Sequence, residues 1–325
     1  MRQAMQKTLA GFVTIICFGC QATLAGEDEI GPRWSSDGEY IYYYSYRHPD
    51  DSLVHDVPSV TMRMRSDGSD ETVLSEGAHR NWWLWPLPCE TGDCDSAKLV
   101  VVSERDATEA FGGSNIYLFD PQEGSYHTMS KSKPEVGEWA LDPSLSSDGN
   151  HMAYIWRSGF RDRSSSRLMV LSRVDQTTFE VTTVKNVDDA AILPDATGII
   201  YSPNEREIHL VELDTMTSEL IYAFEESPDP FMDGLSISQN GQHIAFSYGP
   251  DGLESSEIYR LSIAGDQLDR LTNNGVPDLR PAWAPDNRRI AFNRMLSPDL
   301  DWNDILVIDS KGGQESRLTN NIAEH

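Results

Sequence analysis

Four arginines occupy corresponding places in the chain, each at the end of a run rich in apolar and aromatic residues. They are Arg47, Arg105, Arg157 and Arg294. A guanidinium group binds a carboxylate through two parallel hydrogen bonds, so a ring of these side chains would capture an acidic ligand. Alternatively, each arginine pairs with an acid of its own loop, for which the sequence offers Asp50, Asp106 and Asp299. We favour the pairing and keep the ring as the second interpretation.

Three tryptophans, Trp82, Trp83 and Trp85, form the densest aromatic cluster of the sequence. Aromatic residues of a strand usually pack in the interior, but three so close together do not all fit there. We therefore hypothesise that at least one faces an open channel or rim, where its ring would stack on a peptide or a sugar. The alternative is that all three only pack.

One acidic segment alternates oxygen ligands as calcium-binding loops do. It contains Asp299, Asp301 and Asn303, but Ser310 stands where such a loop needs an acid, and the central glycine is missing. We expect a solvated acidic loop and no cofactor, and we keep calcium as the alternative.

Cys89 and Cys94 are the two cysteines outside the N-terminal apolar stretch. In an oxidising compartment, such a pair indicates a disulfide that pins an enlarged loop. The alternatives are two free thiols or half of a metal site, and structural zinc requires four ligands. The sequence therefore predicts a disulfide.

Motifs for catalysis are missing from the sequence. It contains no Gly-x-Ser-x-Gly, no His-Glu-x-x-His and no glycine-rich phosphate-binding motif. His151 and His243 stand where other repeats have Lys98 and Arg289, so we expect them at solvated hairpin tips. We assign no catalytic residue and favour a protein that is not an enzyme.

The elements that must position these residues come from a phrase that recurs six times. It consists of an Asp or Asn, three turn-like residues and three apolar residues. The anchors are Asp37, Asp95, Asp148, Asp195, Asn240 and Asp286, at steps of 58, 53, 47, 45 and 46 residues. Repeats of this length made of short apolar runs indicate four-stranded units arranged radially. The sequence therefore predicts an all-β fold, a six-bladed β-propeller of four-stranded blades.

We place the blades at about residues 27–77, 78–132, 133–184, 185–228, 229–275 and 276–325. The last blade has a fourth strand of its own near residues 315–319, so we expect the ring to close without strand exchange. Closure would then depend on apolar packing between the first and last blades. The expected contributors are Trp34, Ile41, Trp283 and Ile290.

The last repeat also resembles a known family. The residues Pro281-Ala-Trp283-Ala-Pro-Asp286, followed by Ile290-Ala-Phe292 and Arg317-Leu-Thr319, resemble the WD40-like (PD40) repeat of bacterial TolB-like propellers, and the resemblance covers six copies. The same repeat occurs in prolyl-oligopeptidase-type enzymes and oligogalacturonate lyases. The resemblance implies the propeller fold and a role in protein interaction. TolB carries an α/β domain before its propeller, whereas the first repeat here follows the leader almost directly.

The N-terminus resembles a secretory signal peptide. Arg2 and Lys7 precede an apolar stretch that is too short to span a membrane, and small residues follow it at Ala25 and Gly26. We expect a leader over residues 1–26 and a periplasmic or secreted mature protein without a transmembrane span. The alternative is a lipoprotein anchored through Cys20.

The chain is strongly acidic, with 26 basic and 52 acidic residues and a net charge of −26. This balance excludes nucleic acid as a partner, because binding to phosphates needs a basic surface. The acidity either serves solubility or a salty habitat, or attracts cations and basic partners.

Two function classes follow from these observations. The first is a monomeric interaction scaffold for a protein or peptide partner in the cell envelope, with recognition by the long loops that follow the second strand of most blades. The second is a carbohydrate- or small-molecule-binding propeller, or a lyase-type enzyme, that uses the mouth of the channel. Histidines or carboxylates that converge near the axis would favour the second class.

Overall fold

The computed structural model describes residues 27–47, 59–75, 79–89, 94, 97–107, 112–159, 162–297 and 302–320. The predicted leader with Cys20 lies outside these ranges, as do Asp299 and Asp301 and the side chain of Arg47. Within these ranges no helix is long and apolar enough to cross a membrane.

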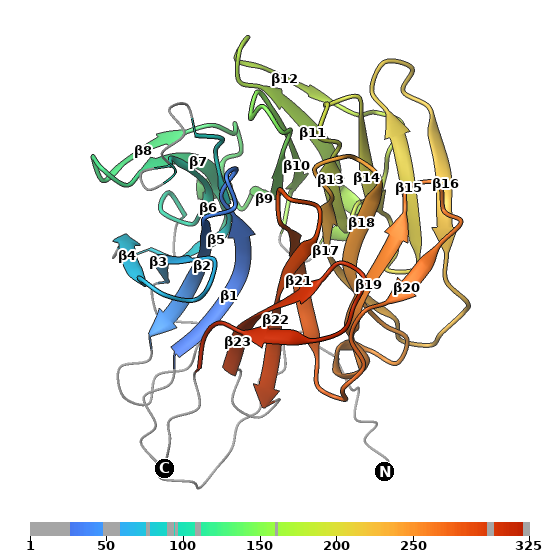
Figure 1. The fold of residues 1–325 in the computed structure, drawn as a ribbon. Coiled ribbons are helices and arrows are strands. Elements are labelled where there is room, and N and C mark those ends of the chain that lie inside the picture. The colour runs from blue at the N-terminus through green and yellow to red at the C-terminus, as the bar shows by residue number, and fades with distance from the viewer. Residues whose placement is uncertain are drawn as a thin grey trace, which may run out of the picture.

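The chain folds into six four-stranded antiparallel sheets, each built from consecutive strands (Figure 1). Blade 1 contains β1 (Glu27–Trp34), β2 (Tyr40–Arg47), β3 (Val60–Arg65) and β4 (Thr72–Ser75), and blade 2 contains β5 (Asn81–Pro86), β6 (Leu99–Ser103), β7 (Asn115–Asp120) and β8 (Ser125–Thr128). Blade 3 contains β9 (Trp139–Leu145), β10 (His151–Arg157), β11 (Arg167–Ser172) and β12 (Thr177–Glu180), and blade 4 contains β13 (Asp189–Ile192), β14 (Gly198–Ser202), β15 (Glu207–Glu212) and β16 (Ser218–Ala223). Blade 5 contains β17 (Phe231–Ile237), β18 (His243–Gly249), β19 (Glu257–Ser262) and β20 (Leu268–Arg270), and blade 6 contains β21 (Asp278–Trp283), β22 (Arg289–Ser297), β23 (Trp302–Asp309) and β24 (Glu315–Arg317). The predicted fold class, a six-bladed β-propeller, is confirmed.

The first strands of the six sheets form a closed inner ring. β1 contacts β5 and β21, and the contacts continue from β5 to β9, β13, β17 and β21. These innermost strands therefore enclose a central channel. Three short 3₁₀ turns do not belong to the strands of this ring: η3 (Pro134–Val136), η4 (Arg163–Ser165) and η5 (Leu253–Ser255).

The repeated phrase forms the hairpin between the first and second strands of each blade. In blade 1 the Ser35 hydroxyl donates to Asp37 Oδ1 at 2.5 Å, and the same oxygen accepts the Glu39 N–H at 2.9 Å. Gly38 has φ +75°, a left-handed conformation that glycine adopts without steric cost. Blade 3 repeats this arrangement with Ser146 and Asp148. The phrase recurs because each hairpin needs an acceptor to hold its backbone.

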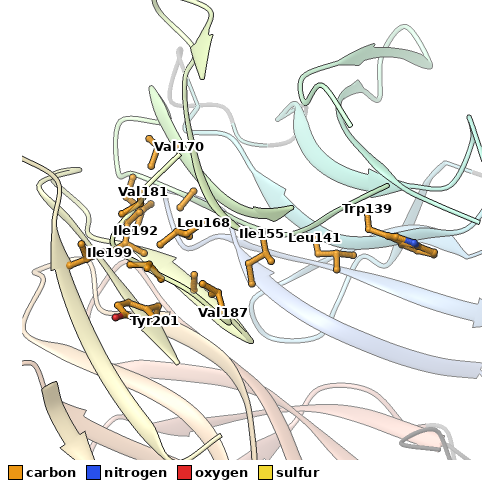
Figure 2. Close-up of a cluster of buried hydrophobic side chains, with 14 residues drawn as sticks. Trp139, Leu141, Ile155, Leu168, Val170, Val181, Val187, Ile192, Ile199 and Tyr201 are labelled. Carbon is orange, nitrogen blue, oxygen red and sulfur yellow. The ribbon is translucent and has the colours of Figure 1, made fainter. Parts of the chain in front are cut away.

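Apolar side chains of facing sheets fill the space between neighbouring blades. Figure 2 shows this between blades 3 and 4, where Ile155 and Leu168 lie near Ile192 and Ile199. Second strands have neighbours on both faces, which explains the uninterrupted apolar runs of the repeat: all five residues of β6 are buried. Each such side chain contributes about 1.5–3 kcal/mol by leaving water.

The ring closes without strand exchange among the residues that the structure covers. β1 pairs with β2 inside blade 1, and β24 is the fourth strand of blade 6. Trp34 and Ile41 pack against blade 6, in a cluster that includes Ala282. This part of the closure prediction is confirmed.

The expected role of Trp283 and Ile290 at the same junction is wrong. Both side chains pack in a different cluster, which contains Ala245 and Ile258 of blade 5. Trp283 occupies the repeat position of Trp34, and Trp34 faces the blade that precedes its own around the ring. Because equivalent positions point the same way, Trp283 faces blade 5, and small alanines of blade 6 face blade 1.

Candidate functional site

Six equivalent residues of the innermost strands surround the channel, one from each blade. In five blades this residue stands six positions before the Asp or Asn of the repeated phrase, and in blade 2, whose first hairpin is enlarged, Trp83 stands twelve positions before Asp95. They are Gly31, Trp83, Asp142, Asp189, Gly234 and Arg280. We call this set the axial ring. Because the six blades share one backbone plan, the difference in chemistry around the ring points to recognition rather than to packing.

The backbone at five of these positions is distorted. β1, β5, β9, β17 and β21 each carry a register shift there, and the axial-ring residue has a positive φ. Three of the five are not glycine: Trp83 has φ +36°, Asp142 +46° and Arg280 +53°. An L-residue in this region costs roughly 1–2 kcal/mol. Such bulges re-aim a side chain away from the ladder and are frequent beside functional sites.

One ion pair lies in the channel, between Arg280 and Asp233. Arg280 Nε donates to Asp233 Oδ2 at 3.3 Å, and about a third of each side chain is exposed, 34% and 32%. The Arg280 guanidinium also lies 6.0 Å from the centre of the Trp83 ring. The charged part of the channel is therefore open to water.

Asp189 is the most enclosed carboxylate of the axial ring. It is 9% exposed, and its Oδ2 accepts the Leu235 N–H at 2.8 Å. Burial and, after it, the nearby Asp233 carboxylate raise the pKa of Asp189 to about 6, while the N–H groups of Leu235, Ala190 and Gly234 oppose the shift. The Asp189 carboxyl therefore releases its proton less readily than an ordinary aspartate does.

Asp142 has no hydrogen bond or ion pair with any residue in the described part of the chain. Burial raises the pKa of Asp142 well above its usual range, and the carboxylates of Asp189 and Asp233 add to the shift. Arg157 and Arg280 oppose it. Asp142 is thus a carboxyl that the fold places in the channel without a partner.

Arg33 presents the opposite charge, also without an acidic partner among the described residues. Its guanidinium stacks on Trp85 at 4.7 Å, its Nη1 donates to the Pro32 carbonyl at 2.9 Å, and its buried Nε has no partner there. Burial lowers the pKa of Arg33 to about 10. Nearby, the Tyr44 hydroxyl is buried and likewise unpartnered in the described structure, on a side chain that is 2% exposed.

A cavity of about 110 Å³ forms another part of the channel, where the inner strands run into their hairpins. Residues of all six blades line it, including Arg33, Trp34 and Trp283. Its hydroxyl groups come from Ser35, Ser36, Ser144, Ser146, Ser147 and Ser236. Arg33 therefore borders the cavity and also lies near the charged residues.

The three predicted tryptophans separate into different environments. Trp83 belongs to the axial ring, while Trp82 stacks on it at 5.8 Å and packs edge-on against Trp139 at 6.5 Å. Trp85 supports the Arg33 guanidinium and lines the cavity. Of the three, Trp83 and Trp85 border the channel.

The predicted arginines have separate partners. Arg105 lies 3.2 Å over the Tyr126 ring, and Arg157, 8% exposed, donates to the Val187 carbonyl at 2.9 Å. Arg294 forms ion pairs with Asp278 at 2.7 Å and Glu315 at 2.5 Å. These acids are not the residues of the same loops that we expected. Arg157 also contributes to the electrostatic surroundings of Asp142.

Cys89 and Cys94 form a disulfide with their Cα atoms 5.3 Å apart, and the Ser36 hydroxyl donates to Cys89 Sγ at 3.3 Å. Across the described ranges, Asp37 with these two sulfurs is the single group of possible metal ligands found together. Sulfurs bonded to each other are not thiolates, so this group does not hold a metal in the oxidised protein. Asn303, the described member of the calcium candidate, is 5% exposed.

Sequence reasoning missed Arg33, Tyr44, Asp142, Asp189, Asp233 and Arg280. The available signal was the repeat itself: one aligned column contains a glycine, a tryptophan, two aspartates, a glycine and an arginine. Three of these six residues are followed directly by a proline, at Pro32, Pro143 and Pro281. A proline has no N–H to donate, so it marks a break in the hydrogen bonding between strands.

Comparison with known proteins supports the fold. No family model and no curated protein sequence matches the chain. Among solved structures, TolB from Acinetobacter baumannii aligns with a TM-score of 0.59 at 13% identity over 88% of this chain, which spans 62% of the length of that TolB chain. An oligogalacturonate lyase in complex with manganese aligns with a TM-score of 0.58 at 13% identity over 90% of this chain and 77% of the lyase. A calcium-binding protein, regucalcin, from Agrobacterium tumefaciens gives 0.61 at 14% identity over 91% of this chain and 98% of regucalcin.

These likenesses, together with the six four-stranded blades, show that the chain has the fold of TolB-like β-propellers.

Proposed function

We propose that this protein is an exported propeller that binds a small polar ligand in its central channel and does not itself catalyse a reaction. The observation that carries the proposal is that the Arg33 Nε and the Tyr44 hydroxyl are buried without partners among the described residues, and that Arg33 lines a cavity to which all six blades contribute. Carboxylates near the axis were the feature that we expected to separate a ligand-binding propeller from a scaffold.

Binding energy has a physical source in this arrangement. Buried polar groups without partners are costly, and a ligand that supplies the missing partners recovers that cost. The strained backbone at Trp83, Asp142 and Arg280 is typical of a site that is preorganised for a ligand. Both considerations support a ligand in the channel.

A lyase-type enzyme receives less support. An activity like that of the oligogalacturonate lyases would require several histidines that converge on one metal. None of the histidines covered by the structure belongs to the axial ring or lines the cavity. These histidines are His79, His127, His151, His209 and His243. Among the described residues, Asp142, Asp189 and Asp233 also do not form a group of three ligand atoms within 4.8 Å of one another. The solved lyase and regucalcin structures bind metals, but the arrangement of charges here favours a charged organic ligand.

The test uses two glycines with the same backbone conformation. A Cβ at Gly31 (φ +70°) of the inner strand β1 would meet no atom within 4 Å, and the same holds for Gly124 (φ +64°) at the β7–β8 turn. Wild-type protein, Gly31→Phe and Gly124→Phe are incubated with a cellular metabolite extract, and retained compounds are identified by mass spectrometry after ultrafiltration. We expect a compound retained by the wild type and Gly124→Phe but not by Gly31→Phe. If nothing is retained, or if Gly31→Phe retains the same compound equally, the proposal is wrong.

A scaffold for a protein or peptide partner in the cell envelope is the second candidate, and one observation favours it. Phe179 on β12 and Leu220 on β16, at the outer edges of two neighbouring blades, are 41% and 52% exposed. Exposed apolar side chains on edge strands are typical of pairing surfaces. A pull-down from envelope extract with wild type and with the double variant Phe179→Ser/Leu220→Ser tests this, with Val136→Ser, 57% exposed at η3, as control. A partner lost only in the double variant would support the scaffold.

A further inference from the structure

The cavity in the channel combines one positive charge with a lining that contains no acid. Among the described residues that line it, Arg33 of β1 is the charged one, and no aspartate or glutamate is present. The cavity measures about 110 Å³. At about 30 Å³ for each water molecule, this space holds a ligand of a few heavy atoms. The charge and the size of the cavity therefore fit a small anion.

Arg33 has one edge of its guanidinium free for a ligand. Its Nη1 donates to the Pro32 carbonyl at 2.9 Å, and the group lies 4.7 Å from the centre of the Trp85 ring. Within the described ranges the buried Nε has no partner, and Nη2 has no hydrogen bond or ion pair. Nε and Nη2 share one edge of the guanidinium and donate in parallel, which is the geometry that the two oxygens of a carboxylate accept.

Three further donors belong to residues that line the same cavity. The Ser144 hydroxyl accepts the Ile192 N–H, and the Ser236 hydroxyl accepts the Trp283 N–H, each at 3.1 Å. Ser144 and Ser236 are 3% and 5% exposed, and neither hydroxyl donates to an acceptor in the part of the chain that the structure describes. The Trp283 Nε1 is also buried and unpartnered there. A ligand that accepts hydrogen bonds would satisfy donors that the fold leaves unused.

Two carboxylates act on Arg33 through space, and both have other partners. Asp189 and Asp233 favour the charged form of Arg33, but neither forms an ion pair with it among the described residues. Asp189 accepts the Leu235 N–H at 2.8 Å, and Asp233 accepts a bond from Arg280 at 3.3 Å. The free edge of Arg33 is therefore left for a ligand in the cavity.

We propose that this cavity binds a small monocarboxylate, with the two carboxylate oxygens on Nε and Nη2 of Arg33. Ser144, Ser236 and Trp283 supply further donors around the ligand. This inference rests on the proposed function and specifies its class of ligand. A neutral ligand of the same shape leaves the guanidinium without a counter-charge, and a cation is repelled by it. A monoanion fits better than a dianion, because the nearby aspartates repel negative charge.

The test follows the indole N–H resonance of Trp283 by NMR in the purified ¹⁵N-labelled protein, with the resonance identified by its loss in Trp283→Phe. The protein is titrated with acetate, propionate, acetamide, methylammonium and sulfate at constant ionic strength. We expect acetate or propionate to shift this resonance to saturation and to bind about tenfold or more tightly than acetamide, which has the shape of acetate without its charge. Methylammonium and sulfate should bind more weakly than the carboxylate.

Three outcomes of this titration would overturn the inference. The first is that neither carboxylate binds. The second is that acetamide binds as tightly as acetate, because the charge of Arg33 would then play no part. The third is that sulfate binds more tightly than either carboxylate, because the site would then select a dianion.

Variants connect the affinity to Arg33. Arg33→Gln removes the charge and should weaken the binding of the better carboxylate by about tenfold or more, since hydrogen bonds to a charged group are lost. Arg33→Lys keeps the charge without the paired donors and should weaken binding less. Arg288→Gln changes an exposed arginine that does not line the cavity, and this control should bind as the wild type does. Thermal melting verifies the fold of each variant, and wild-type affinity in every folded Arg33 variant would contradict the inference.

The outcome is separable from that of the proposed function. If the metabolite extract yields a neutral or cationic compound whose retention depends on Gly31, and no carboxylate binds, the channel binds a small polar ligand and only the carboxylate inference fails. If the extract yields nothing and no carboxylate binds, both fail.

Discussion

Trp34 Nε1 donates a hydrogen bond of 3.1 Å to the Ala282 carbonyl across the junction between the first and last blades. The side-chain amide of Asn293 adds two more bonds across this junction. Its Oδ1 accepts the Gly31 N–H at 2.8 Å, and its Nδ2 donates to the Glu29 carbonyl. Closure therefore depends on polar contacts as well as on the apolar packing that we expected from the sequence.

The first testable prediction concerns this junction. Every other pair of neighbouring blades is connected by the chain, whereas only side-chain contacts and these bonds hold blade 1 against blade 6. We expect hydrogen exchange to be faster in β1 and β21 than in β13 and β17, since this junction opens most easily.

Asn293→Ala should accelerate exchange in β1 further and destabilise the protein by about 2 kcal/mol, because buried backbone groups lose their partners. Ser247→Ala, which removes the bond to the Arg280 N–H at the equivalent place between blades 5 and 6, is the matched control and should leave β1 unchanged. Equal protection at both junctions in the wild type would show that the ring has no weak point there.

The second prediction concerns the disulfide. Free-thiol titration of unfolded mature protein should find no reactive thiol, because Cys89 and Cys94 are bonded. Replacing both by serine should cost roughly 2 kcal/mol of unfolding free energy for a loop this short. Chemical denaturation measures this cost, and two reactive thiols in the wild type would contradict the bond.

How far the sequence predicted the molecule depended on the repeat. Asp37, Asp148 and Asp286 fix hairpins by local hydrogen bonds, and local chemistry can be read from the chain, so the fold class and the strand order followed. The partners of Arg157 and Arg294 could not be predicted, because Val187 and Glu315 lie 30 and 21 positions away in the sequence and meet these arginines only once the sheets have formed.

The axial ring shows the same limit more sharply. Gly31, Trp83, Asp142 and Arg280 are far apart in sequence, and no local pattern places them on one axis. Their convergence follows from aligning the repeats by position and asking where that position points. The misassignment of Trp283 has the same origin, since the direction of a strand side chain was inferred from residue type rather than from its place in the repeat.

The third prediction concerns stability and pH. The folded protein raises the pKa of Asp142, so the folded state binds a proton over a pH range in which the unfolded state does not. Stability contributed by this proton is present below the ordinary aspartate pKa and is lost as the pH rises through the raised one. Asp142→Asn removes the titration.

We therefore expect Asp142→Asn to melt at a higher temperature than the wild type at pH 8, with a smaller difference at pH 4. Each kcal/mol corresponds to about 2–4 °C in a domain of 150–250 residues and to less in a longer chain. Asp214→Asn, at an exposed turn, should show no such dependence. A pH-independent difference for Asp142→Asn would remove the titration as its cause.

The fourth prediction concerns export. The mature protein should begin near residue 27, because residues 1–26 have the pattern of a cleaved leader. N-terminal sequencing of protein from the periplasmic or secreted fraction decides this. A cytosolic protein that retains Met1 would contradict it, and a lipid-modified N-terminus at Cys20 would support the lipoprotein alternative.

The claim at the centre of this account is that a small polar ligand binds in the channel, close enough to Asp142 to change the surroundings of its carboxyl group. The most direct measurement is a ¹³C NMR pH titration of the aspartate carboxyl groups, with the Asp142 resonance identified by its loss in Asp142→Asn. We predict a pKa above the ordinary range for Asp142 in the free protein, because burial and the neighbouring carboxylates disfavour its charge. Saturation with the compound retained in the metabolite assay should shift this pKa, since a bound ligand changes the charges and the solvent around the carboxyl group. An ordinary pKa that the ligand leaves unchanged would contradict the claim.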